Sequence, residues 1–308
     1  MPTDDNSMMV AARLSTQQVS QVRALADSCE ERDGYSMEAR LDIGTLETRP
    51  EGSVSDVLWY DSEQLVGFAG MNSYSDPSEV EATILVHPDF RRRGIGRCMA
   101  RVVVRECQKR GVRRLLFVVP QESREGAGFA HMMGTRHSHS EYTMDLDVSR
   151  IPPFEPIHDA VELRPAGAED VPIMATIVAS AFAEPVGEEE QALVRLMKDS
   201  TRITYLATQD GRPVGVIQSA VSDGRAFIVH FAVRPEMQGR GIGRQMLMAI
   251  VRGLQNSGGK WITIEVETEN QNALSLYQRC GFVTVNATDY ELLELPRIPT
   301  APELLFDR

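Results

Sequence analysis

One short phrase occurs twice in this chain of 308 residues. It reads HPDFRRRGIGRCMARVVVR at residues 87–105 and RPEMQGRGIGRQMLMAIVR at residues 234–252. Corresponding positions are 147 residues apart, and residues 86–134 align with 233–281 without a gap at 15 identities in 49 positions. Solenoid repeats are only about 20–50 residues long. The long period therefore indicates one domain that has been duplicated.

The length of the chain predicts the same division, because domains of about 150 residues are common. We expect an N-terminal domain at 1–150 and a C-terminal domain at 161–308. The segment 151–160 reads IPPFEPIHDA, which is rich in proline and has no hydrophobic periodicity. Such a composition predicts a linker.

Both halves contain the same order of predicted elements. In each half, apolar strand-like runs precede the repeated phrase, an amphipathic helix begins within it, and a further strand follows. The strands predicted in the first half are 57–60, 65–71, 80–86 and 115–119, with a helix at about 94–110. In the second half they are 161–164, 201–208, 213–219, 227–233, 261–266 and a last strand from Val283, with helices at 170–182, 188–198, about 242–254 and 273–280.

Composition excludes several classes of protein. Hydrophobic residues make up 42% of the chain and charged residues 25%, as in ordinary globular proteins. No apolar run approaches the ~18–20 residues that cross a bilayer, and the N-terminus has no signal-peptide pattern, so we expect a cytoplasmic protein without membrane contact. The cysteines show no metal-ligand spacing and predict reduced core thiols and no metal site; they are Cys29, Cys98, Cys107 and Cys280.

Charge is informative both in total and locally. The net charge of −12 argues against nucleic acid as a partner, since duplex binding favours a basic surface. Arginines nevertheless gather at both copies of the phrase, and this repetition favours an anion site over solvated side chains. They are Arg91, Arg92, Arg93 and Arg97 in the first copy, and Arg234, Arg240 and Arg244 in the second.

The glycines of the phrase predict where an anion would bind. A turn that leaves a strand and enters a helix exposes several backbone N–H groups at the positive end of the helix dipole. Gly241 and Gly243 have no Cβ that would keep a diphosphate from this backbone. Two other phosphate motifs do not fit. A P-loop needs Lys followed by Ser or Thr, and the dinucleotide fingerprint needs a third glycine where Met99 and Met246 stand.

At these residues the chain resembles the GNAT superfamily of N-acetyltransferases. VRPEMQGRGIGRQML is similar to the acetyl-CoA loop of that family, with Gln238, Gly241 and Gly243 in its Q/R-x-x-G-x-G/A signature. IEVETENQNALSLYQRCGFV, at 264–283, is similar to its second signature. The first half has the same loop as RRRGIG, with Arg91 in the place of the glutamine. The resemblance thus covers nearly the whole chain as a tandem pair.

This resemblance implies an α/β (α+β) fold with two tandem GNAT domains, each a mixed, mostly antiparallel sheet flanked by helices. It also implies acetyl-CoA as the cofactor, with the pantetheine arm paired to the backbone near Val233. Asn270 is either a contact of the cofactor or only a helix cap. The cofactor-binding residues implied in the second half are Ala232, Val233, Gln238, Gly239, Arg240, Gly241, Ile242, Gly243, Arg244 and Asn270, and those in the first are Arg91, Arg92, Arg93, Gly94, Gly96 and Arg97.

Acetyl transfer needs a donor of a proton to the departing thiolate and an acceptor of a proton from the amine. Relatives in the family carry the donor at the position of Tyr277, and a phenol of pKa about 10 suits a thiol of about 8.5. Tyr277 could alternatively only pack under the cofactor. Glu265, Glu267 and His230 are candidate bases. Glu265 and Glu267 share the strand face opposite Ile262, Ile264 and Val266, and either could instead be a solvated carboxylate. His230 could equally be a hydrogen-bonded core residue.

The two halves differ at these positions. Across the 147-residue offset every polar group that could move a proton in the second half is missing from the first. Glu265 aligns with Val118, Asn270 with Ser123, Tyr277 with Ala130 and Phe282 with Thr135. We therefore expect a degenerate, non-catalytic first domain and a catalytic second domain.

The resulting functional hypothesis is an acetyl-CoA-dependent N-acetyltransferase that acts by direct attack of a primary amine, carried by a small molecule or a peptide. One alternative follows from the two-domain architecture, which resembles the mycothiol synthase-type members of the family and implies an amino-sugar thiol precursor as acceptor. Another alternative is a non-catalytic acyl-CoA sensor. The sequence leaves open the acceptor amine, the acyl-chain length and the oligomeric state.

Overall fold

The computed structural model describes residues 6–35, 41, 46, 56–73, 78–151, 161–198, 202–222 and 225–296. The chain forms two compact units. The first unit is Met1–Ser140 together with Ala287–Arg308, and the second unit is Glu141–Asn286. Each is an α/β unit with its own sheet and its own hydrophobic core.

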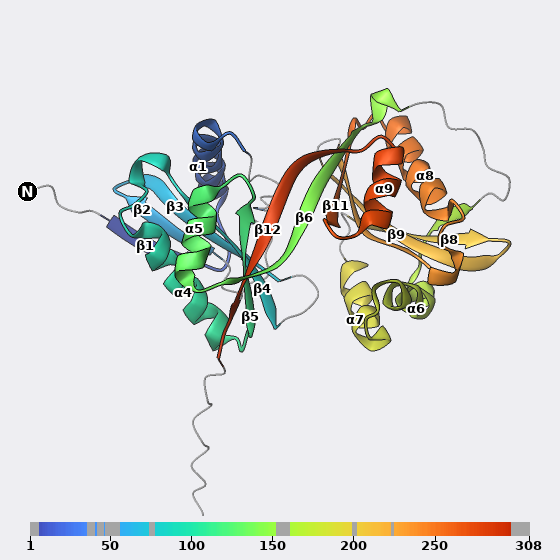
Figure 1. Ribbon diagram of the computed structural model, residues 1–308, viewed down its shortest axis with the longest axis horizontal. Helices are drawn as coiled ribbons and strands as arrows, with labels where there is room; N and C mark the ends of the chain where they lie inside the picture. The colour runs from blue at the N-terminus through green and yellow to red at the C-terminus, as the bar shows by residue number, and fades with distance from the viewer. Residues whose placement is uncertain are drawn as a thin grey trace, which may run out of the picture. The chain divides into compact units, whose positions relative to one another are not determined.

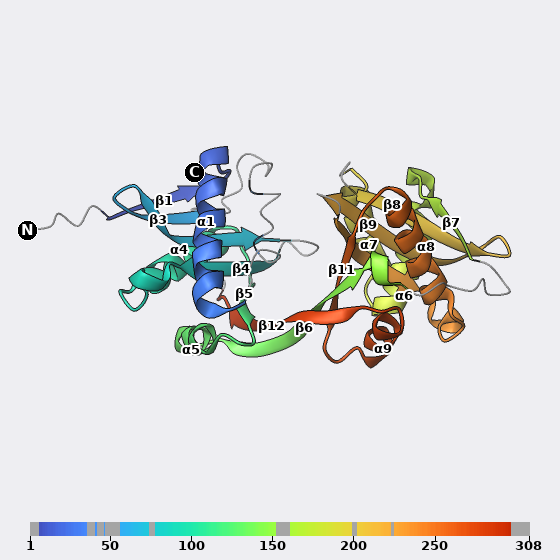
Figure 2. The same ribbon diagram turned by 90° about the horizontal axis from the view of Figure 1, so that it is seen from above.

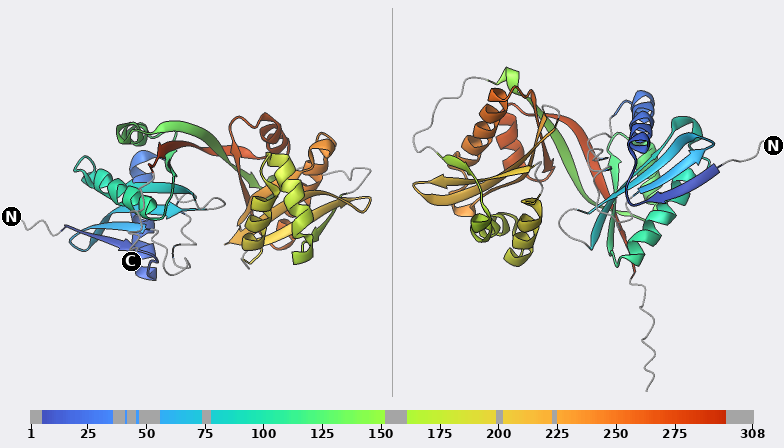
Figure 3. Two further views of the ribbon diagram at one scale, coloured as in Figure 1. Left: turned by 90° about the horizontal axis from the view of Figure 1, so that it is seen from below. Right: turned by 180° about the vertical axis from the view of Figure 1, so that it is seen from behind.

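The sheet of the first unit has the strand order β1-β2-β3-β4-β5-β12. Its strands are β1 (Asn6–Ala11), β2 (Asp56–Asp61), β3 (Gln64–Asn72), β4 (Glu79–Val86), β5 (Arg114–Pro120) and the later part of β12 (Val283–Glu294). Among the described residues, the helices with bounds in this unit are α1 (Thr16–Asp33), the short η1 (Pro88–Phe90), α4 (Ile95–Lys109) and α5 (Arg124–Met133). Helices α1 and α4 pack on separate clusters of the sheet's side chains, so they cover opposite faces (Figure 3).

The sheet of the second unit has the equivalent order β7-β8-β9-β10-β11-β6. Its strands are β7 (Glu162–Pro165), β8 (Arg202–Gln209), β9 (Arg212–Ser222), β10 (Arg225–Val233), β11 (Trp261–Glu267) and the later part of β6 (Arg136–Asp147). The short helices of the chain in this region are η2 (Val148–Arg150), η3 (Ala168–Asp170) and η4 (Pro235–Met237). The longer helices are α6 (Val171–Phe182), α7 (Val186–Leu196), α8 (Ile242–Asn256) and α9 (Gln271–Arg279).

Helices cover both faces of this second sheet (Figures 1 and 2). Side chains of α6 and α7 pack with Leu206, Val216 and Ala232 on one face. Side chains of α8 and α9 pack with alternate strand residues on the other face. The amphipathic helix predicted at about 242–254 is confirmed, because six apolar side chains at helical spacing along α8 are buried: Ile242, Met246, Leu247, Ile250, Val251 and Leu254.

Strand pairing confirms the mixed, mostly antiparallel sheet. Among the described pairings only β4–β5 and β10–β11 are parallel. Both parallel pairs are short. β4 pairs with β5 only over Glu79–Ala82, and β10 pairs with β11 only over Arg225–Ile228. Beyond these residues the two strands of each pair diverge, so each sheet opens at the carboxyl ends of its central strands.

The units divide the chain differently from the expected domains 1–150 and 161–308. Residues Glu141–Asp147 of β6 pair with β11 in the second unit, and Thr288–Glu294 of β12 pair with β5 in the first. Burial explains this exchange. Met144 and Leu146 of β6 lie in the core of the second unit, and Leu292 of β12 packs with Leu116 of the first. Residues 152–160 of the expected linker lie outside the described residues.

Candidate functional site

The repeated phrase forms the same strand–turn–helix in both units. Gly94 and Gly241 are the N-caps of α4 and α8, and both have left-handed backbone with φ of 88° and 78°. Two residues earlier the backbone is left-handed again, with φ of 64° at Arg92 and 73° at Gly239. The turns thus match residue by residue, although only the second unit has glycine at both left-handed positions.

The second turn exposes backbone donors. In the described part of the chain, the amides of Gly239, Arg240, Gly241, Ile242 and Gly243 have no hydrogen-bonded partner. A Cβ at Gly239 or at Gly241 would meet no atom within 4 Å, so space is open around the turn. Open amides in front of a 15-residue helix form a site that fits a diphosphate.

The first residue of each motif has a structural contact in both units. Gln238 donates from Nε2 to the carbonyl oxygen of Val233 at 3.0 Å, and Arg91 donates from Nε to that of Val86 at 3.1 Å. Each side chain therefore ties the turn to the end of the preceding strand. The backbone amides, and not these side chains, are left free for a ligand.

The predicted arginines are in different environments. The remaining nitrogens of Arg91 bind Asp33 at 2.6 and 2.8 Å and Glu125 at 3.2 Å, and the bond to Asp33 raises the pKa of the guanidinium. Arg93 stacks on Phe90 at 4.7 Å. Nη2 of Arg97 lies 3.2 Å from the sulfur of Met132. Arg92, Arg240 and Arg244 are exposed.

The strands that lead into the two turns differ. β10 shifts its register with β9 between Val229 and Phe231, and the bulged residue His230 has a φ of 22°. A positive φ is uncommon for a residue with a side chain, and bulges often re-aim side chains near active sites. β4 pairs with β3 in an unbroken register through Thr83, the residue equivalent to His230.

Tyr277 lies next to this bulge. Its side chain is buried, and its ring packs against Phe231 of β10 at 6.3 Å and against Phe282 at 5.9 Å between ring centroids. Burial raises the pKa of the phenol, which keeps the hydroxyl protonated. Asn270 caps α9 by accepting a hydrogen bond from the amide of Ala273 at 3.1 Å.

The predicted faces of β11 are confirmed. Ile262, Ile264 and Val266 are buried with α8 and α9, whereas Glu265 and Glu267 are exposed. By alternation along the strand, both carboxylates belong to the face that α6 and α7 cover. Glu265 and Glu267 thus lie on a different face of the sheet from Tyr277.

One acidic residue near the bulge was not predicted. Glu189 of α7 is only 5% exposed, and its Oε2 lies 3.9 Å from Nε2 of His230. The sequence contains a signal for it, because Glu189 occupies the apolar face of α7 with Ala192 and Leu193. A carboxylate on the buried face of an amphipathic helix needs either a partner or a function.

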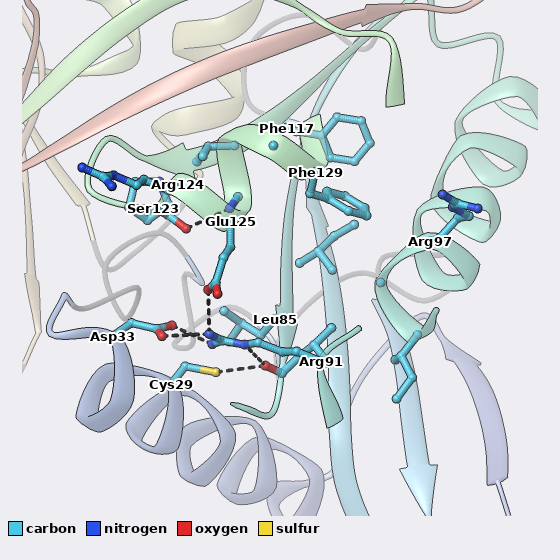
Figure 4. Close-up of a pocket in the computed structure, with 18 of the residues that line it drawn as sticks. Cys29, Asp33, Leu85, Arg91, Arg97, Phe117, Ser123, Arg124, Glu125 and Phe129 are labelled. Carbon is cyan, nitrogen blue, oxygen red and sulfur yellow. Dashed lines mark hydrogen bonds and ion pairs between the residues drawn. The ribbon is translucent and has the colours of Figure 1, made fainter. Parts of the chain in front are cut away.

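The first unit has a cavity of about 730 Å³ between the diverging ends of β4 and β5. Phe117, Phe129 and Leu85 line its apolar part, and the ion pairs of Arg91 with Asp33 and Glu125 lie at its polar part (Figure 4). Ser123 caps α5 through the amide of Gly126 at 3.0 Å, as Asn270 caps α9. Ala130, at the position of Tyr277, is completely buried.

Together, two short parallel strand pairs, each followed by a left-handed glycine turn and a helix, define an α/β protein with the same strand–turn–helix in both units. The chain belongs to the acetyltransferase (GNAT) family, whose model matches residues 19–134 and 172–282. It is a tandem GNAT protein and a member of a family of acetyl-CoA-dependent N-acetyltransferases. The family uses acetyl-CoA as acyl donor and acetylates amines.

Individual relatives are more distant. The chain is 26% identical to mycothiol acetyltransferase of Streptomyces coelicolor, over 92% of this chain and 94% of that protein. A solved GCN5-related N-acetyltransferase from Sphaerobacter thermophilus has a TM-score of 0.77 at 19% identity and covers 94% of this chain and 97% of its own. A tandem GNAT protein from the clavulanic acid biosynthesis pathway has a TM-score of 0.69 at 17% identity, with 96% and 100% coverage. These two structures share the fold.

No helix among the described residues is both long and apolar enough to cross a membrane.

Proposed function

We propose that the chain transfers an acetyl group from acetyl-CoA to a primary amine by direct attack, and that the reaction takes place in the second unit. The observation that carries this proposal is the asymmetry of the two openings. In the second unit the open amides of the turn, the bulge at His230 and the buried phenol of Tyr277 all adjoin the end of β10. The first unit has an unbroken strand and Ala130 at the equivalent positions.

In this proposal the amides of Gly239–Gly243 hold the diphosphate of acetyl-CoA, and the opening between β10 and β11 takes the pantetheine arm beside Ala232 and Val233. Arg240 and Arg244 add positive charge at the rim. Asn270 supports the site from the start of α9, where it is a helix cap. The amine nitrogen forms the new C–N bond, the C–S bond breaks, and the thiolate takes a proton from the hydroxyl of Tyr277.

The acceptor that the site favours is cationic before it reacts. The protein has a net charge of −12. In addition, Glu265 and Glu267 are exposed on the face of β11 opposite the one that packs against α8 and α9. An acidic surface concentrates ammonium compounds near the site. Peptide N-termini, lysines, polyamines and aminoglycosides all meet this description. The four cysteines form no disulfide, which suits the cytoplasm as the place of the reaction.

One particular acceptor has independent support. The similarity to mycothiol acetyltransferases extends over most of both chains, which favours an amino-sugar thiol precursor as the second candidate acceptor. In that case the acceptor would react much faster than peptides or polyamines of equal concentration.

The test is a screen for thiol release from acetyl-CoA over a panel of these amines, with Tyr277→Phe as the variant. We expect kcat to fall about 100-fold in the variant because the thiolate loses its proton donor, with the Kd for acetyl-CoA unchanged. An unchanged kcat would exclude Tyr277 as the acid. Binding of acetyl-CoA without thiol release from any amine would instead support the sensor.

A further inference from the structure

The proposed reaction leaves one group near the β10 bulge without a role. Glu189 of α7 is only 5% exposed, and its Oε2 has no hydrogen-bond partner among the described residues. An unsatisfied buried carboxylate oxygen is costly, so it indicates a functional contact that forms in another state of the site. This oxygen is also the atom that lies 3.9 Å from Nε2 of His230.

The surroundings of the two side chains set their protonation. Burial, a side-chain hydrogen bond with Glu184 and the negative charges of Glu184 and Glu188 together raise the pKa of Glu189 to about 7, with burial as the largest cause. Burial lowers the pKa of His230, and the positive charge of Arg202 on β8 acts in the same direction, whereas Glu184 opposes it. At neutral pH the imidazole is therefore uncharged and able to accept a proton, with a carboxyl beside it that is close to losing its own.

The position of this pair complements that of Tyr277. His230 meets α7 on the face that α6 and α7 cover, whereas the next residue, Phe231, stacks on Tyr277 on the face that α8 and α9 cover. Both lie just beyond Ile228, where β10 stops pairing with β11. A thioester held in this opening would thus have a proton donor at one face and a proton acceptor at the other.

We propose that His230 accepts the proton that the acceptor amine loses, and that Glu189 is the positioning residue that orients His230 and stabilises its imidazolium. This inference rests on the proposed function and adds the identity of the base. As the amine nitrogen bonds to the acetyl carbon, its proton passes to the imidazole nitrogen that is turned away from Glu189. The electron pair of the broken C–S bond leaves with sulfur, which takes a proton from the hydroxyl of Tyr277. Afterwards the imidazolium gives its proton to solvent, and Tyr277 regains a proton from solvent.

The 3.9 Å separation is compatible with this role. Hydrogen bonds between catalytic groups are often long before the substrate is bound and shorten in the reacting complex. A charged imidazole would draw the ionised carboxylate toward it, and the orphaned Oε2 has no other hydrogen bond to break. The pair therefore gains an interaction only as the reaction proceeds, which is the kind of interaction that raises kcat.

The pH dependence of kcat/KM tests the pair on the full-length protein. In the wild type kcat/KM should rise with pH to a plateau above about 7, since Glu189 must lose its proton to stabilise the imidazolium. In Glu189→Gln we expect the plateau to be about 10–100-fold lower. The rise should also move to lower pH, where only His230 still titrates. The ionisation of the amine itself should appear at the same pH in both proteins.

Matched variants distinguish a general structural effect of Glu189→Gln from the loss of its positioning role. Glu190→Gln changes an exposed neighbour of Glu189 and should leave kcat, the pH profile and the melting temperature as they are. His230→Gln should lose the rise near pH 7, and adding Glu189→Gln to it should reduce the rate no further, because Glu189 acts through His230. The KM for acetyl-CoA should stay unchanged throughout.

The outcomes are distinguishable. A wild-type chain that acetylates no amine overturns both the proposed function and the pair. An active wild type whose Glu189→Gln variant keeps the same pH profile overturns the pair and leaves the function standing. Independent, additive losses in the double variant overturn the coupling of Glu189 to His230.

Discussion

The two glycine turns have nearly the same backbone conformation, whereas the strands that lead into them differ in conformation. Gly94 and Gly241 cap their helices with φ values within about ten degrees of each other, but only β10 contains a bulge before the turn. In the proposed reaction, anion binding depends on the turn, whereas proton transfer depends on β10 and on α9. A duplicated domain can therefore lose its acid–base groups and keep its turn.

Cofactor binding should give the largest difference between the units. Gly241→Asp places a carboxylate beside the open amides, in space that is empty and in a left-handed conformation that Asp tolerates. Since like charges about 4 Å apart repel by about 4 kcal/mol near a surface, we expect the KM for acetyl-CoA to rise about 100-fold or more. The matched change Gly94→Asp should alter KM at most a few-fold. Equal effects of both changes, measured by initial rates, would contradict a second-unit active site.

Arg91 and Gln238, the first residues of the two motifs, should contribute differently to the free energy of unfolding. Arg91→Met removes the hydrogen bonds to Asp33 and should lower the free energy of unfolding by about 2 kcal/mol, as for bonds between charged groups. Gln238→Met removes one neutral bond at an exposed side chain and should cost about 0.5–1 kcal/mol. Urea unfolding monitored by fluorescence measures both. A larger loss in Gln238→Met would show that the ion pairs of Arg91 contribute little.

The smallest expected effect is on stability, and it concerns the first of the two left-handed residues in each turn, Arg92 and Gly239. Arg92 has a φ of 64° where the second unit has Gly239. Replacing Arg92 by glycine relieves about 1–2 kcal/mol of strain but adds about 0.4–1 kcal/mol of freedom to the unfolded chain. We expect Arg92→Gly to stabilise the protein by about 0.5 kcal/mol and Gly239→Arg to destabilise it by a similar amount. A decrease in the melting temperature of Arg92→Gly would indicate that the arginine side chain has a stabilising contact.

Local signals in the sequence were enough for much of the fold. The buried face of α8 and the alternation along β11 follow from periodicity, and the glycine turns follow from residues that few other conformations require. The partner of each terminal strand could not be predicted, because the alternation in β6 would fit the edge of either sheet. The bulge at His230 and the contact with Glu189 depend on tertiary packing, and only the acidic residue on the apolar face of α7 hinted at them.

The exchange of β6 and β12 has a consequence for synthesis on the ribosome. β5 cannot pair with β12 until residues Thr288–Glu294 have been synthesised, about 170 residues after β5 itself. At the usual 5–20 residues per second this takes roughly ten to thirty seconds, during which the nascent chain presents an unpaired β edge. Such an edge readily pairs with other extended segments, so the nascent chain is prone to aggregation until Thr288–Glu294 have been made.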